Sequence, residues 1–239
     1  EIMSDNNITH MWPLSGVTNL RDLMMTNNPI SDFNVLSNFN LNNLSSLSVS
    51  DTSFSDLGLL LNMDGLEHLY AENTNITNLS PLTSHLGQLR ELSLRNNNIT
   101  DIGVITLGNF PELNELNIEG NPNLVIGEGS SAKSVVDALE SEGVTVHYTP
   151  SVVVTFSDAN LENRLRQIMG KTDGETFYKP EVSGLTELNL SDQGITNLAG
   201  LEHFESLQTL NLSDNTISSL EPLSDLSELR ELNISGQEI

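Results

Sequence analysis

Five side chains in the first half of the sequence have the chemistry of a binding surface: Met24, His68, Tyr70, Glu72 and Arg95. Tyrosine and arginine are enriched among the residues that contribute most to protein–protein binding. Histidine and glutamate beside them can add hydrogen bonds and charge. These residues stand at positions of a repeating pattern that elsewhere hold mostly small polar residues, so we interpret them as candidate ligand contacts. The alternative, that they are ordinary surface residues, stays open.

Residues that could perform catalysis do not occur at the spacings that catalysis needs. No serine lies in a nucleophile-elbow pattern, and the five histidines include no pair at metal-ligand spacing (His10, His68, His85, His147 and His203). The chain has no cysteine and no glycine-rich phosphate loop, which excludes thiol chemistry and disulfides. Carboxylate pairs such as Glu140 with Glu142 are expected to be solvated helix residues. We therefore expect a protein that is not an enzyme.

The charge balance restricts the partners and cofactors. Lys and Arg number 9 against 33 Asp and Glu, which gives a formal net charge of −24. Nucleic acids and anionic lipid surfaces require a positive patch, so we expect neither as a partner. No apolar run approaches the roughly 18 residues of a membrane span, so no membrane insertion is expected. Acidic residues outside a cell can bind Ca²⁺, but no Asp-x-Asp-x-Asp-Gly loop occurs. We expect no cofactor, with Ca²⁺ as the one alternative left open.

A repeated phrase, Leu-x-x-Leu-x-Leu-x-x-Asn-x-Ile, must position the candidate side chains. Its first leucines stand 22 to 24 residues apart in two runs, at Leu20, Leu44, Leu66, Leu89 and Leu113 and then at Leu185, Leu207 and Leu229. A sustained period of roughly 20 to 29 residues with this consensus sequence is the signature of a leucine-rich repeat. The predicted fold class is α/β: a leucine-rich-repeat solenoid, a right-handed horseshoe with a parallel β-sheet on the concave face and short 3₁₀ or irregular segments on the convex face.

Each phrase predicts one short strand and one turn. The leucines of the Leu-x-Leu pair point inward and the residues between them point outward, because side chains alternate along a strand. The asparagine that follows can bond backbone groups left unpaired by the turn, so that stacked repeats form an asparagine ladder. We expect a weaker ladder where other residues replace asparagine, at Thr52, Thr74, Gln193 and Gln237.

The repeats are interrupted between Leu124 and Leu185. Residues 130–142 read as a helix that begins at Ser130 or Ser131 and ends at Gly143, and residues 144–148 read as a strand. After Pro150 a second helix is expected over 158–169, with Leu161, Leu165 and Ile168 on one face. Helices flanking a repeat array typically cap its ends.

The predicted domain organisation is therefore two tandem arrays with caps between them. The first array occupies residues 1–149, starts in the middle of a repeat and carries a helix–strand C-terminal cap over about 125–149. Residues 150–184 form a helical N-terminal cap for the second array, and residues 185–239 form that array, which is truncated. We expect the chain to be a fragment of a longer protein.

The sequence of the repeats resembles that of bacterial internalin-like leucine-rich-repeat proteins. Leu89-Arg-Glu-Leu-Ser-Leu-Arg-Asn-Asn-Asn-Ile and Leu212-Ser-Asp-Asn-Thr-Ile-Ser-Ser-Leu carry this resemblance. The stretch Phe156-Ser-Asp-Ala-Asn-Leu-Glu-Asn-Arg-Leu is similar to the first segment of many secreted, multidomain surface proteins of that broad family. The resemblance implies a secreted or bacterial cell-surface protein with a role in adhesion or recognition. No immunoglobulin-like domain lies within the chain, so no specific internalin receptor is implied.

Three functions fit these observations. The first is a recognition module that binds a protein through the concave face of the first array. The second is a glycan-binding accessory domain of a larger secreted protein, in which Tyr70 or Trp12 would stack on a sugar ring. The third is a structural spacer. Trp12, the only tryptophan, is expected to be partly exposed, either contacting a partner or packing against an upstream repeat. Open strand edges near Glu1 and Ile239 could also allow self-association of the fragment.

Overall fold

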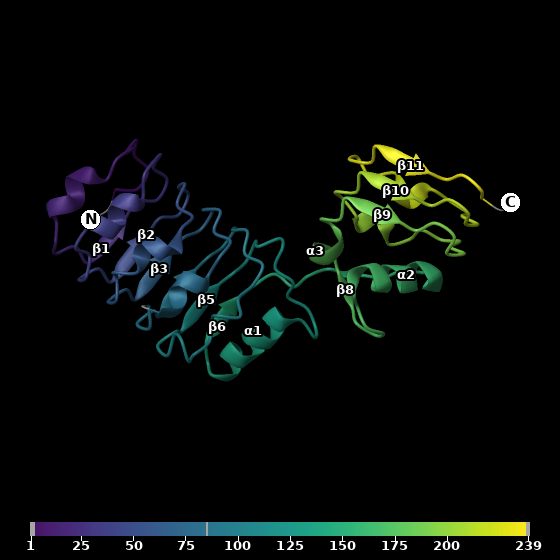
Figure 1. Ribbon diagram of the computed structural model, residues 1–239. Coiled ribbons are helices and arrows are strands. Elements are labelled where there is room, and N and C mark those ends of the chain that lie inside the picture. The colour runs from purple at the N-terminus through teal and green to yellow at the C-terminus, as the bar shows by residue number, and fades with distance from the viewer. Residues whose placement is uncertain (1–2, 85, 238–239) are drawn as a thin grey trace. The chain divides into compact units, whose positions relative to one another are not determined.

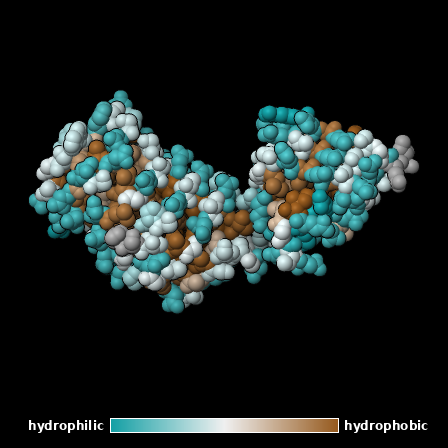
Figure 2. Space-filling view, in the orientation of Figure 1, coloured by the Kyte–Doolittle hydropathy of each residue, from teal (hydrophilic) through white to brown (hydrophobic). Residues whose placement is uncertain are grey.

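The computed structural model describes residues 3–84 and 86–237 and divides the chain into two units. Unit 1 comprises Glu1–Ile126 and Ser130–Pro150, and unit 2 comprises Gly127–Gly129 and Ser151–Ile239. Each unit has its own hydrophobic core. In Figure 2 hydrophilic residues cover most of the visible surface of each unit, and hydrophobic residues show between them.

Unit 1 is built on a six-stranded parallel sheet in which the strands follow their order in the sequence, β1-β2-β3-β4-β5-β6 (Figure 1). Every strand has three residues, and the central residue of each strand faces the next in register, as Leu47 faces Leu69. The strands are Asp22–Met24, Ser46–Ser48, His68–Tyr70, Glu91–Ser93, Glu115–Asn117 and Thr145–His147.

The core of unit 1 lies between this sheet and a row of short 3₁₀ segments. The central leucines of β1 to β5 are at most 1 % exposed, because the alternation of the strand turns them inward. The 3₁₀ segments are η1 (Trp12–Gly16), η2 (Asn34–Asn38), η3 (Leu57–Leu60) and η4 (Ser80–Ser84). The predicted leucine-rich-repeat solenoid, with a parallel sheet and 3₁₀ connections, is confirmed.

Helix α1 (Ser131–Ser141) follows the last repeat of unit 1 and leads into β6. The Ser130 side chain accepts a hydrogen bond from the Lys133 amide and so caps the N-terminus. Three of its apolar side chains, Ala132, Val136 and Leu139, are buried in the core. Strand β6 then pairs in parallel with β5, which makes a strand–helix–strand crossover at this end of the sheet.

Unit 2 begins with a small two-stranded antiparallel sheet that the repeat pattern does not predict. Strands β7 (Val153–Val154) and β8 (Phe177–Tyr178) flank helix α2 (Ala159–Met169), and α3 (Lys179–Val182) follows. Phe177 packs edge-on against Phe156, with ring centroids 5.1 Å apart. Leu161 and Leu165 of α2 are fully buried, but Ile168, on the same face near the end of the helix, is 39 % exposed.

The repeats of unit 2 form a separate three-stranded parallel sheet, in the order β11-β10-β9. The strands are β9 (Glu187–Asn189), β10 (Thr209–Asn211) and β11 (Glu231–Asn233), with 3₁₀ segments η5 (Leu201–His203) and η6 (Glu221–Leu223) between them. Asp158, the N-cap of α2, also accepts hydrogen bonds from the amides of Thr196 and Asn197. This one carboxylate therefore connects α2 to the first repeat of the sheet.

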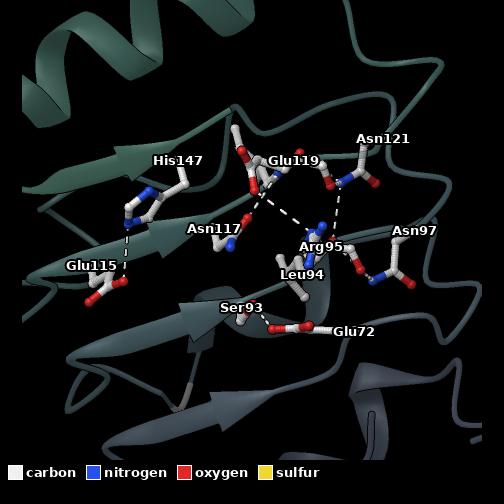
Figure 3. Close-up of polar contacts among 11 residues, drawn as sticks. Glu72, Ser93, Leu94, Arg95, Asn97, Glu115, Asn117, Glu119, Asn121 and His147 are labelled. Atoms are coloured by element: carbon white, nitrogen blue, oxygen red, sulfur yellow. Dashed lines mark hydrogen bonds and ion pairs between the residues drawn. The ribbon is translucent and has the colours of Figure 1, made fainter. Parts of the chain in front are cut away.

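The asparagine ladder is present and joins neighbouring repeats. The amide of Asn97 donates to the carbonyl oxygen of Ala71, one repeat earlier, at 2.8 Å and to that of Leu94 at 3.0 Å. Its side-chain oxygen accepts from the Ile76 amide at 2.8 Å. Asn28, Asn121 and Asn215 repeat this arrangement. Figure 3 shows the side chains of Asn97 and Asn121 on successive turns.

Substitution of the ladder asparagine has different effects at different repeats. The Thr52 and Thr74 hydroxyls bond a carbonyl of their own repeat, although the Thr74 hydroxyl also donates to Asn97 of the next repeat at 3.0 Å. The Gln193 side chain bonds carbonyls of its own turn. These positions are weaker, as predicted. The prediction is wrong for Gln237, whose amide donates to the carbonyl of Leu212, one repeat earlier, at 2.8 Å. Its longer side chain still spans the gap between repeats.

A second ladder lies directly before the first and consists of residues in the left-handed region. Each has a positive φ, which only glycine, asparagine and aspartate adopt readily. The positions are Asp5, Asn27, Asp51, Asn73, Asn96, Gly120, Asp192, Asp214 and Gly236. Their side chains also bond along the stack, since Asn27 donates to Asp5 at 2.9 Å and Asn73 donates to Asp51 at 2.8 Å. Backbone geometry therefore dictates this position of the repeat.

Candidate functional site

The outward-facing side chains of β1 to β6 form two rows across the sheet of unit 1, which we call the sheet face. Parallel register sets the neighbours, so that Tyr70 faces Ser48 on one side and Ser93 on the other. The first row is Asp22, Ser46, His68, Glu91, Glu115 and Thr145, and the second row is Met24, Ser48, Tyr70, Ser93, Asn117 and His147. The residues that follow the strands, including Glu72, Arg95 and Glu119, continue this face.

Tyr70 is the aromatic centre of the sheet face. Its ring is half-buried beside three serines of β2 and β4 (Ser46, Ser48 and Ser93), each at most 8 % exposed, because these small residues leave room for a large neighbour. The Tyr70 hydroxyl donates a short hydrogen bond to the carboxylate of Glu91. Burial, this hydrogen bond and the negative charges of Glu91 and Glu115 raise the pKa of Tyr70 to about 12.

Glu72 lies beside Tyr70 and is held in place by serines. Its carboxylate accepts a hydrogen bond from the Ser93 hydroxyl at 2.6 Å, which Figure 3 shows, and its backbone amide donates to Ser50 at 3.0 Å. A hollow of about 130 Å³ opens between these side chains. We call it the Tyr70 hollow, and its lining residues are Tyr70, Glu72, Glu91, Leu92, Ser93, Glu115 and Asn117.

The two basic groups on the neighbouring strands each pair with one carboxylate (Figure 3). Arg95 lies 3.7 Å from Glu119, measured from Nε to Oε2. His147 on β6 lies 3.1 Å from Glu115, measured from Nε2 to Oε1. Both ion-pair partners are about half exposed, so these pairs contribute little to stability. They provide partners for two of the carboxylates of the sheet face.

The structure brings together only some of the residues that the sequence singled out. Tyr70 and Glu72 line the same hollow, and His68 lies on the same strand as Tyr70, facing the same way. Met24 is on β1, two strands from β3 in the sheet. Arg95 is exposed and pairs with Glu119 rather than with the hollow.

Trp12 lies apart from the sheet face. It begins η1, one of the 3₁₀ segments on the other side of the core, and is 65 % exposed. Its predicted partial exposure is therefore confirmed, while its contact with a partner stays a prediction. The neighbouring Met11 takes the buried position, at 2 % exposed.

Sequence reasoning did not select Glu91 and Glu115 for this site. Both are outward strand residues in a repeat with many glutamates, so composition alone does not distinguish them. The signal is the repeat period, because the parallel register places Glu91 and Glu115 on the two strands that follow Tyr70. Adding one repeat to the candidate His68 leads to Glu91, and adding a second repeat leads to Glu115.

Metal and membrane features are absent from the part of the chain that the structure describes. No group of three or more His, Asp or Glu side chains among residues 3–84 and 86–237 could hold a metal ion. His85 lies outside these residues. None of the helices within the described ranges has the length and apolar character needed to cross a bilayer.

The sheet of unit 2 shows what this fold looks like without such a cluster. The second outward residue of each strand is asparagine: Asn189, Asn211 and Asn233. Each side-chain oxygen accepts a hydrogen bond from the backbone amide two residues later, at 3.0 to 3.2 Å. These asparagines stabilise the end of their own strand, so the uniform polar surface of unit 2 has a structural explanation.

The family model described as leucine-rich repeats (2 copies) matches residues 88–125 and 205–239. These two segments lie in different units and contain the phrases beginning at Leu89, Leu113, Leu207 and Leu229. No curated protein sequence gives a significant match to this chain.

Three solved structures illustrate the similarity. An internalin (inlF) from Listeria monocytogenes is 20 % identical over 100 % of this chain and 67 % of its own, with a TM-score of 0.47. An internalin C2 (inlC2) from the same organism is 21 % identical over 97 % of this chain and 69 % of its own, with a TM-score of 0.44. A structure of CBM51-2 and INT domains from Clostridium perfringens ZmpB, in complex with GlcNAc, is 31 % identical over 42 % of this chain and 22 % of its own, with a TM-score of 0.33.

The matched segments agree with the geometry of both units. The parallel strands follow one another in sequence order, one for each repeat, and the ladder asparagines connect successive turns. Together with the matched repeats, this arrangement shows that both units have a leucine-rich-repeat fold, as the repeated sequence pattern predicted.

Proposed function

We propose that the chain is a non-catalytic recognition module that binds a protein partner across the sheet face of unit 1. The observation that carries the proposal is the Tyr70 hollow. It combines a half-buried aromatic ring, three carboxylates and a cavity on one exposed sheet, whereas the equivalent sheet of unit 2 carries asparagines bonded to their own backbone. Solenoid sheets form extended binding surfaces, and aromatic residues in hollows are typical anchors of protein interfaces.

The absence of catalytic spacing supports a binding role over an enzymatic one. Four carboxylates of the sheet face are held by hydroxyls, an arginine or a histidine, in pairs that suit a recognition surface (Glu72, Glu91, Glu115 and Glu119). The resemblance to internalin-like proteins supports a location outside the cell, as a secreted or bacterial cell-surface protein. We expect no nucleic-acid partner, since the formal net charge is −24.

One observation favours a glycan as the second candidate ligand. Trp12 is 65 % exposed, and an exposed indole offers a flat apolar surface on which a sugar ring could stack. In that case the ligand would bind at η1, away from the sheet face. Self-association of the chain through strand edges near Glu1 and Ile239 stays a separate prediction, because both residues lie outside those the structure describes.

A paired screen tests these assignments. The purified protein is applied to a panel of cell-surface proteins and to a glycan array, together with three variants, Tyr70→Ala, Trp12→Ala and Glu140→Ala. Glu140 is an exposed residue of α1 and serves as the control. Circular dichroism melting curves confirm that each variant is folded.

The proposal predicts a protein partner whose binding is lost in Tyr70→Ala and retained in Glu140→Ala. Glycan binding that is lost in Trp12→Ala would replace it with the glycan function. Binding of a protein that survives Tyr70→Ala, or no binding on either array, would overturn the assignment of the sheet face. The second outcome would indicate a structural spacer.

A further inference from the structure

The sheet face of unit 1 carries an excess of negative charge that its own side chains do not balance. Its outward positions and those directly after the strands hold five carboxylates and one guanidinium: Asp22, Glu72, Glu91, Glu115 and Glu119 against Arg95. Arg90, which precedes β4, pairs with Glu67 and Glu112 instead, at 3.6 and 3.7 Å. The face as a whole is therefore complementary to a positively charged surface.

The carboxylates nearest to Tyr70 have neutral donors. Glu91 accepts from the Tyr70 hydroxyl, and Glu72 accepts from the Ser93 hydroxyl at 2.6 Å. A hydroxyl satisfies one lone pair of a carboxylate without cancelling its charge. Burial is the largest cause that raises the pKa of Tyr70 to about 12, and the hydrogen bond to Glu91 and the negative charges of Glu91 and Glu115 raise it further.

The Tyr70 hollow has the size of one side-chain head group. Its volume of about 130 Å³ corresponds to roughly four water molecules at about 30 Å³ each. An aromatic ring and three carboxylates, those of Glu72, Glu91 and Glu115, line it, and the Glu115 side chain is about half exposed. An aromatic face attracts cations, and carboxylates bind guanidinium and ammonium groups through charge-assisted hydrogen bonds.

We propose that the Tyr70 hollow takes an arginine or lysine side chain of the protein partner, so that the partner presents a basic segment to the sheet face. This inference rests on the proposed function and specifies the chemistry of the ligand. The basic head group would lie against the Tyr70 ring and bond the carboxylates of Glu91 and Glu72. Glu115, Glu119 and Asp22 would attract further basic residues on either side.

The test must separate a site from the general attraction of an acidic protein for basic peptides. The probe is a fluorescently labelled peptide of arginines spaced by glycines, and its binding is measured by fluorescence anisotropy at low and at physiological salt. The site variant is Glu91→Gln with Glu115→Gln. The control is Glu140→Gln with Glu142→Gln on and beside α1, which removes the same charge from exposed positions away from the sheet face.

We expect the site variant to weaken peptide binding about fivefold or more, and the control variant to stay within about twofold of the unmodified protein. We also expect Tyr70→Phe to retain binding, since the ring remains, and Tyr70→Ala to weaken it. Equal losses in the site and control variants would show attraction by net charge alone and would overturn the inference.

The protein partner found by the screen distinguishes failure of this inference from failure of the proposed function. In one outcome the partner binds the sheet face and yet binds the double variant Glu91→Gln with Glu115→Gln as tightly as the unmodified protein. If neutralising the partner's basic residues also leaves binding unchanged, the inference is wrong and the proposed function stands. If Tyr70→Ala itself leaves partner binding intact, the proposed function fails.

Discussion

Replacing Asn97 by alanine tests how much the ladder contributes to the stability of unit 1. Asn97 is 3 % exposed and makes its three shortest bonds to the backbone with the carbonyls of Ala71 and Leu94, at 2.8 and 3.0 Å, and the amide of Ile76, at 2.8 Å. Its side chain also accepts from the Thr74 amide and hydroxyl, at 3.3 and 3.0 Å, and donates to the Arg95 carbonyl at 3.3 Å. Asn97→Ala removes all of these bonds at once. The variant leaves the Leu-x-Leu strand unchanged, so the effect belongs to the ladder.

The three backbone groups with the shortest bonds to Asn97 lose unequal shares of their hydrogen bonding. The Ala71 carbonyl keeps the Thr74 hydroxyl at 2.9 Å, and the Leu94 carbonyl keeps the Asn121 amide at 3.1 Å. Each therefore loses one hydrogen bond of two, which costs about 1 kcal/mol. The Ile76 amide loses its buried acceptor, which costs about 1 to 3 kcal/mol. The sum predicts a loss of about 3 to 5 kcal/mol in the free energy of unfolding.

Urea denaturation followed by far-ultraviolet circular dichroism measures this loss in the transition of unit 1. The matched control is Asn98→Ala, because Asn98 is exposed and its amide lies 3.5 Å from its nearest ladder neighbour, Asn75. Asn97→Thr should fall between the two, since threonine at Thr52 bonds only its own repeat. A loss below about 1 kcal/mol in Asn97→Ala, or one equal to that of Asn98→Ala, would refute the reasoning.

Three further predictions concern backbone strain and titration. Gly120→Ala should destabilise unit 1 by about 1 to 3 kcal/mol, because φ is +66° and a Cβ would lie 1.9 Å from the side-chain oxygen of Asn96. Gly143 has a φ of +91° but open space around it, so Gly143→Ala should lower the stability of unit 1 by less. Burial alone would raise the pKa of Asp158, but hydrogen bonds from backbone amides and a threonine hydroxyl lower it below 3.8. The ionised Asp158 therefore stabilises unit 2 fully above about pH 4, and this stabilisation is lost as the pH falls through the lowered pKa. Asp158→Asn should remove this pH dependence in urea unfolding measured between pH 2 and 7. Tyr70→Phe should remove the tyrosine that ionises near pH 12 in a 295 nm titration, and Glu91→Gln should lower the pKa of Tyr70.

Each of these predictions has a result that contradicts it. Equal losses in Gly120→Ala and Gly143→Ala would show that strain alone, and not the close approach, sets the cost. A stability curve of unit 2 that falls equally with acid in the parent protein and in Asp158→Asn would remove Asp158 as the titrating group. A Tyr70 pKa that is unchanged in Glu91→Gln would show that burial alone accounts for its value.

The candidate site could be predicted only in part. Tyr70 and Glu72 stand out because their types differ from the small polar residues at equivalent positions. Their neighbours Glu91 and Glu115 do not, since glutamate is common in outward positions of this chain. Met24 and Arg95 are also unusual in type, but the register places Met24 two strands away and Arg95 beside Glu119. Residue type indicates a candidate, and the register decides which candidates meet.

Some features of the fold depended on side-chain length and on contacts that no repeat pattern contains. Gln237 is long enough to reach the repeat before it, whereas Gln193 stands in the first repeat of unit 2 and bonds its own turn. Ile168 has the spacing of a buried helix residue but is 39 % exposed. The antiparallel pairing of β7 with β8 lies outside the repeats, so the 22- to 24-residue period could not predict it.

The sequence by itself determined the strands, the turns and the ladder. Leu-x-Leu must point inward because side chains alternate, the buried asparagine must bond the turn, and the residue before it must tolerate a positive φ. All three requirements are local and recur in every repeat, which is why one phrase specifies them. Tertiary structure decided the chemistry of the sheet face. The Tyr70 hollow forms because stacking aligns residues about one period apart, and side chains that are distant in the sequence meet only after the strands have paired.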